Sequence, residues 1–191
     1  MSTDHGLSPS QTVGPYLSIG LLGDLITPDL IDPSDPRAVR VSGTLLDGAG
    51  APVPDGMIEI WQANTVGRYD HPSDTREELP LERGFRGFGR SGTVDGGRFA
   101  FTTVKPGPVP WPGGGMQAPH LLVGVFARGL LKRAATRMYF PDEMDANAVD
   151  PVLSRLEPQA RATLVATPGS DGSLQFDIRL QGSNATTFFA V

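Results

Sequence analysis

Apolar and polar residues alternate one by one along residues 174–181. The apolar members are Leu174, Phe176, Ile178 and Leu180, and the polar members between them are Gln175, Asp177, Arg179 and Gln181. A period of two places the apolar side chains on one face of an extended strand. Residues 99–103 repeat the pattern more briefly, with Phe99 and Phe101. The chain is therefore expected to be built mainly of half-buried strands.

Short turn sequences separate the other expected strands. Asp-Gly pairs begin at Asp47, Asp95 and Asp171, and the chain holds 24 glycines and 18 prolines. Short connections favour antiparallel pairing, because parallel strands need long crossovers. The further strands are expected at residues 38–46, 56–63, 121–127, 134–140 and 162–166. We predict an all-β fold, an antiparallel β-sandwich with one or two short helices.

One short helix is expected at residues 150–156. Asp150 suits the N-cap, Pro151 suits the first helical position, and Pro158 limits the length. The domain organisation is expected to be an irregular N-terminal arm at residues 1–37 followed by one sandwich domain at 38–191. Residues 68–90 form a long, charged, turn-rich excursion, a kind of loop that is often functional.

The charge and composition exclude several classes of function. A net charge of −5 and a pI near 5.1 argue against binding to a nucleic-acid backbone. The absence of cysteine excludes disulfides and thiolate metal sites. The polar start lacks a signal-peptide pattern, and the longest apolar run, residues 120–131, is too short to span a bilayer. A cytoplasmic protein with no nucleic-acid or membrane partner is expected.

Local motifs alone give only weak indications of chemistry. Tyr69, Asp70 and His71 could supply metal ligands, although ordinary loop packing explains the same spacing. His120 opens an apolar strand and is expected to be a hydrogen-bonded residue at the edge of the core. Basic residues surround the turn at 129–131 and could hold an anion or simply remain solvated: Arg128, Lys132, Arg133 and Arg137.

Seven segments with a shared order and spacing carry a resemblance to a known family. They are residues 8–16 (SPSQTVGPY), 43–47 (GTLLD), 52–64 (PVPDGMIEIWQAN), 67–72 (GRYDHP), 85–90 (FRGFGR), 105–111 (KPGPVPW) and 138–140 (MYF). In these segments the chain resembles the intradiol dioxygenases, which cleave aromatic rings. The resemblance implies a β-sandwich core, in agreement with the strand pattern.

The resemblance also implies a set of iron ligands that this chain has only in part. The family holds a ferric ion with two tyrosines and two histidines. Tyr69 and His120 match two of these positions, whereas Val109 and Leu122 replace the other two, and Gln117 replaces a family arginine. Because valine and leucine have no lone pairs and ferric iron favours anionic oxygen ligands, no metal is expected to bind this chain.

The lost ligands resemble the iron-free α subunit in the branch of the family that cleaves protocatechuate (3,4-dihydroxybenzoate). The resemblance implies a homologous β partner that carries Fe(3+), a higher symmetric α–β oligomer, and insertion of O2 to give 3-carboxy-cis,cis-muconate. It assigns no catalytic residue to this chain, which would complete the partner's substrate pocket. The implied substrate-binding residues are Thr12, Gly14, Pro15 and Tyr16 of the arm, and Arg133.

Three alternatives stay open at this point. Arg133 could only bridge the two subunits, and the arm could be a simple interface strap. The whole chain could be a stand-alone ligand-binding sandwich that has lost catalysis. It could also be a self-sufficient metalloenzyme that uses Tyr69, His71 and His120.

Overall fold

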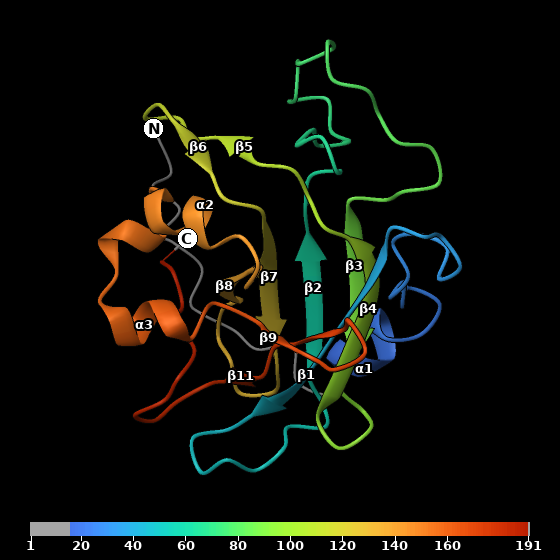
Figure 1. The fold of residues 1–191 in the computed structure, drawn as a ribbon. Helices are drawn as coiled ribbons and strands as arrows, with labels where there is room; N and C mark the ends of the chain where they lie inside the picture. The colour runs from blue at the N-terminus through green and yellow to red at the C-terminus, as the bar shows by residue number, and fades with distance from the viewer. Residues whose placement is uncertain (1–15, 191) are drawn as a thin grey trace, which may run out of the picture.

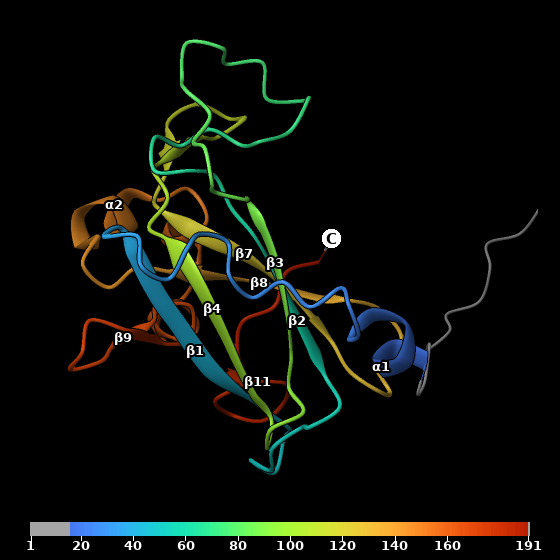
Figure 2. The ribbon, with the colours of Figure 1, turned by 90° about the vertical axis from the view of Figure 1, so that its right-hand side faces the viewer.

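The computed structural model describes residues 16–190 and contains two β-sheets that face each other across the core (Figures 1 and 2). In the first sheet, β1 (Ala38–Leu46) pairs antiparallel with β4 (Arg98–Val104). The second sheet is antiparallel throughout, in the order β3-β2-β7-β8. Its strands are β2 (Met57–Trp61), β3 (Phe88–Gly92), β7 (His120–Phe126) and β8 (Ala134–Tyr139). The expected β-sandwich is confirmed.

The period of two decides which side chains enter the core. In β7, Leu121, Val123 and Val125 are buried in the cluster between the sheets. Burying one such side chain contributes about 1.5–3 kcal/mol. His120 and Leu122 therefore lie on the opposite, outer face of the second sheet. This outer face carries the candidate site.

The last strand is broken where the alternation predicts continuity. It consists of β10 (Leu174–Gln175) and β11 (Ile178–Arg179), which both pair with β1, and both in parallel. Between them, the Asp177 side chain accepts a hydrogen bond from the backbone N–H of Thr44 at 2.8 Å. A carboxylate thus takes a place that a backbone carbonyl fills in a regular strand. At the sheet edge, β9 (Thr167–Pro168) pairs antiparallel with β10.

The helices are short and lie at two sides of the sandwich. On one side are α2 (Met144–Val149), the 3-10 turn η1 (Leu153–Arg155) and α3 (Pro158–Ala162), and on the other is α1 (Tyr16–Leu21) (Figures 1 and 2). The helix expected at 150–156 is only the turn η1, whose N-cap is Val152 and not Asp150, although Asp150 accepts hydrogen bonds from the N–H groups of Val152 and Leu153. The strand expected at residues 162–166 is wrong: α3 reaches into this segment, and only an isolated bridge at Val165 is extended.

Part of the expected N-terminal arm packs on the sandwich. Thr27 forms a β-bridge with Arg90, and Leu30 and Ile31 are buried in the core. The arm boundary at residue 37 stays a prediction. Among the helices of residues 16–190, none combines the length and the apolar character needed to cross a bilayer.

The charged excursion projects beyond the end of β2 (Figure 1). It runs to the start of β3 at Phe88 and faces the small hairpin of β5 (Val109–Pro110) and β6 (Met116–Gln117). Gly67 fixes this arrangement. Its φ is +82°, and a Cβ atom there would lie 2.2 Å from the carbonyl oxygen of Pro108. Only glycine allows this close approach.

Candidate functional site

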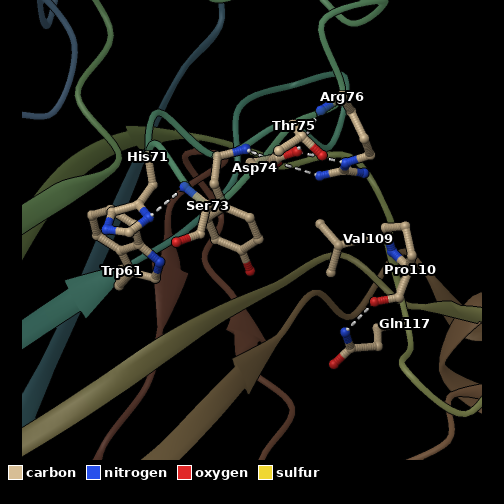
Figure 3. A pocket seen from close by; sticks show the side chains of 10 residues that line it. Trp61, His71, Ser73, Asp74, Thr75, Arg76, Val109, Pro110 and Gln117 are labelled. Atoms are coloured by element: carbon tan, nitrogen blue, oxygen red, sulfur yellow. Dashed lines mark hydrogen bonds and ion pairs between the residues drawn. The ribbon is translucent and has the colours of Figure 1, made fainter.

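A cavity of about 620 Å³ lies between the excursion and the β5–β6 hairpin (Figure 3). Its size is in the range of small-molecule sites. The excursion and β2 supply one side of the cavity, and the hairpin supplies the other. The residues that line it are Trp61, Tyr69, His71, Ser73, Asp74, Thr75, Arg76, Val109, Pro110 and Gln117.

Aromatic rings form one wall of this cavity. Trp61, at the end of β2, stacks on Tyr69 with the ring centroids 5.9 Å apart and the planes at 7°. His71 meets the same indole edge-on at 6.1 Å, and its Nδ1 accepts a hydrogen bond from the N–H of Ser73 at 3.1 Å. These contacts hold Tyr69 and His71 in fixed orientations toward the cavity.

An ion pair orders the backbone around Tyr69. Asp74 accepts the N–H of Tyr69 at 2.8 Å and the Nε–H of Arg76 at 2.8 Å. The hydrogen bonds from Arg76 and from the backbone keep the pKa of Asp74 well below its usual range. Arg76 also donates to the carbonyl oxygen of Gly67 at 2.7 Å. Sequence reasoning missed this pair, although an Asp followed two residues later by Arg in a turn was the available signal.

The positions that the resemblance assigns to iron ligands lie in and around this cavity. Tyr69 and Val109 line it, and Val109 pairs across the hairpin with Gln117. Burial raises the pKa of Tyr69, while the charges of Arg137 and Arg76 oppose that rise. The net effect favours the neutral phenol.

His120 is held as a neutral imidazole. The side chain is 4% exposed, and its Nδ1 donates a hydrogen bond to the carbonyl oxygen of Ala118 at 2.7 Å. Burial, with a further contribution from the charge of Arg137, lowers the pKa of His120 to about 4. The ring also packs against Tyr139 at 5.6 Å.

A guanidinium stands beside these positions. Arg137 on β8 is the cross-strand partner of Leu122 on β7. Its Nη1 donates to Gln117 Oε1 at 2.8 Å and to the Tyr139 hydroxyl at 3.3 Å. That hydroxyl in turn donates to Asp150 at 3.2 Å. Arg137 is therefore positioned by Gln117 and Tyr139, and Asp150 in turn holds the Tyr139 hydroxyl.

These residues do not fit a ferric ion. Two of the four positions, Val109 and Leu122, offer no donor atom, and a fixed positive charge lies next to them. The loss of one anionic oxygen ligand and one imidazole ligand, together with the added cation, disfavours a trivalent metal.

A second cavity, of about 380 Å³, lies on the outer face of the second sheet. Arg133 lines it and is itself an exposed residue. The stem of Arg133 lies over Gly124, where a Cβ atom would come within 3.1 Å of its Cδ. Arg137, Leu122 and Trp61 line the same cavity. Trp61 thus borders both cavities.

The other predicted site residues are more scattered. Tyr16 opens α1 and is 70% exposed. Thr12, Gly14 and Pro15 lie outside the described residues. The basic cluster around residues 129–131 does not form one site, because Arg128 pairs with Asp55 at 3.0 Å.

The metalloenzyme alternative gains no support from the geometry. Tyr69 and His71 line the larger cavity, whereas His120 is not among the residues that line it.

Comparisons with known proteins give one family. Residues 24–182 match the family described as Dioxygenase. The chain is 42% identical to the protocatechuate 3,4-dioxygenase alpha chain of Burkholderia cepacia over 96% of this chain and 97% of that one. The beta chain from the same organism is 34% identical over 88% of this chain and 75% of its own length. The solved dioxygenase domain of a carbohydrate-binding fusion protein from Streptomyces sp. SirexAA-E superposes with a TM-score of 0.61, at 27% identity, over 83% of this chain and 89% of that one.

Proposed function

This chain belongs to the intradiol ring-cleavage dioxygenase family, and we propose that it acts as the iron-free α subunit of a protocatechuate 3,4-dioxygenase. The enzyme would insert both atoms of O2 between the two hydroxylated carbons of protocatechuate and release 3-carboxy-cis,cis-muconate. The single observation that carries the proposal is the pair Val109 and Leu122 at two ligand positions, with Arg137 beside them. The similarity to an alpha chain over nearly its full length supports the same role.

The proposal assigns the Fe(3+) and its ligands to a homologous β partner in the cytoplasm. The similarity to a beta chain supports such a partner, since the two sequences align over 88% of this chain. A complex of equal α and β numbers would assemble further into a symmetric oligomer. This chain would contribute binding surface and substrate contacts, and no catalytic residue.

Arg133 is the residue of this chain that we propose to reach the partner's substrate. Its guanidinium is exposed at the rim of the second cavity, so it is free to contact a bound carboxylate across an interface. The ring carboxylate of protocatechuate would gain a charge-assisted hydrogen bond there. Tyr16, which is also exposed, and the arm residues Thr12, Gly14 and Pro15 would close the same pocket.

Co-expression with the β partner tests the proposal. Ring cleavage, followed as O2 uptake and loss of protocatechuate absorbance, is expected only when both chains are present. The chain alone is expected to be poorly soluble, because an obligate interface would be uncovered. A well-behaved monomer that leaves the β chain unaffected would instead indicate a stand-alone binding module.

A further inference from the structure

The second cavity has the chemical character of a ligand site of its own, and we name it the aromatic cavity. Four rings contribute to its walls, and Leu122 adds an aliphatic patch. Its volume of about 380 Å³ suits a molecule of one ring, because small-molecule sites start at roughly 300 Å³. The rings belong to Trp61, Phe88, Trp111 and Phe189.

Two guanidiniums enter this largely apolar space. Arg133 lies at the rim and Arg137 lies deeper, half-buried, with its charge 6.0 Å from the centroid of the Phe189 ring. Neither arginine has a carboxylate within ion-pairing distance in the portion of the chain that is described. A partly desolvated cation without an anionic partner is costly, and an anionic ligand relieves that cost.

The neighbouring acids are already engaged elsewhere. Glu59, which also lines the cavity, accepts a hydrogen bond from Arg90 at 2.9 Å. Asp150 lies one hydroxyl group beyond Arg137 and accepts backbone N–H groups, among them that of Ala118 at 2.9 Å. Gln117 and Tyr139 orient the guanidinium but bring no formal charge. The positive charge therefore remains available to a ligand.

We propose that the aromatic cavity binds a small aromatic carboxylate, with Arg137 holding the carboxylate and the surrounding rings holding the ligand's ring. A guanidinium matches a carboxylate through two parallel hydrogen bonds, and the aromatic walls favour a planar ring. No metal takes part. The inference rests on the proposed function only in assuming a β partner with a separate ferric site, so that an α–β pair has one catalytic and one metal-free site.

Equilibrium dialysis of the purified α–β complex with benzoate tests the inference. Benzoate has the ring and the carboxylate but no hydroxyl groups to be cleaved. The wild-type complex is expected to bind two benzoates per α–β pair. With Arg137→Gln, the second site should weaken at least about tenfold, which is the usual effect of losing a charge-assisted hydrogen bond. Arg137→Lys should weaken it less, because the charge remains.

Three controls make the counts specific. Arg128→Gln removes an exposed arginine that is paired with Asp55, and it should leave two sites. Benzamide, which has the ring without the charge, should not fill the metal-free site. The visible absorption of the partner's ferric–phenolate centre reports its own site, and Arg137→Gln should not change that titration.

Several results would overturn the inference. The first is a wild-type complex that binds only one benzoate per α–β pair. The second is benzamide that binds the metal-free site as well as it binds the ferric site. The third is an Arg137→Gln complex that still binds two benzoates with the wild-type affinities. A cavity filled by a side chain of the partner would produce the first of these. If the Arg137→Gln complex fails to assemble, the number of benzoates bound by the wild type and the benzoate affinity of Arg137→Lys still test the inference. Absence of ring cleavage or of ferric absorption would instead contradict the proposed function, independently of these counts.

Discussion

Leu122 and Arg137 face each other across β7 and β8, on the outer face of the second sheet. One is an alkyl group at a position where the family has a histidine ligand, and the other is a permanent cation. Arg137 also donates to Gln117, which stands where the family has an arginine. A guanidinium is therefore retained in this region, but it comes from a different strand. Around Arg137 this region holds a defined set of hydrogen bonds, to Gln117 and to the Tyr139 hydroxyl.

Substitution of Arg133 tests its proposed contact with the substrate. In the complex with wild-type β, Arg133→Ala is expected to raise the KM for protocatechuate roughly tenfold or more, since a hydrogen bond to a charged group contributes about 1.5–3 kcal/mol. The iron content should stay unchanged. Steady-state kinetics and metal analysis measure both, and Arg128→Ala on the same turn is the control. Unaltered kinetics would remove Arg133 from the substrate site.

Gly67 provides a test of the turn that shapes the larger cavity. Gly67→Ala places a Cβ atom 2.2 Å from the Pro108 carbonyl oxygen at a φ of +82°. We expect this variant to lower the free energy of unfolding by about 3 kcal/mol or more, from backbone strain and overpacking together. In the control Gly84→Ala, φ is +78° and no atom lies within 4 Å of the new Cβ, so only the strain of about 1 kcal/mol applies.

Calorimetry of the complex distinguishes these two variants. At about 2–4 °C per kcal/mol for a chain of this size, Gly67→Ala should lower Tm several times more than Gly84→Ala. Equal shifts for the two would show that the excursion is not packed against Pro108.

The buried His120 predicts a specific loss of stability in acid. Its pKa is about 4 in the folded chain and 6.5 as an ordinary value, so the unfolded chain takes up the proton first as the pH falls. The free energy of unfolding is therefore unaffected by the protonation of His120 above pH 6.5. It falls progressively between pH 6.5 and 4, by about 3 kcal/mol in total. His120→Gln should therefore lose less free energy of unfolding than the wild type between about pH 7 and 5.

Denaturant titrations of the complex at the two pH values measure this difference. A pH dependence that is the same in His120→Gln as in the wild type would contradict a neutral buried imidazole.

The strands that define the sandwich could be predicted because their burial repeats every two residues. The segments expected at 38–46, 121–127 and 134–140 fall on β1, β7 and β8 to within one residue at each end. The break between β10 and β11 could not be predicted, since it depends on a hydrogen bond from Thr44 to Asp177 across 133 positions. Local alternation carries no information about a partner so distant.

For the candidate site, individual residues could be predicted from the sequence, but their arrangement in space could not. The resemblance to the family singled out Tyr69, Val109, His120 and Leu122, and two of these side chains have no donor atom for iron. The role of Arg137 was hidden, because the sequence groups it with Arg128, which pairs with Asp55, and with Arg133, which lies only at the rim of the second cavity. Only the strand register brings Arg137 opposite Leu122 and within reach of Gln117.

Anomalous scattering at the iron absorption edge, from crystals of the α–β complex, tests the metal-free site most directly. We predict one strong iron peak in each β subunit and none between Val109 and Leu122 of this chain, where Arg137 should instead contact Gln117. An iron peak coordinated by Tyr69 or His120 of this chain would contradict the assignment.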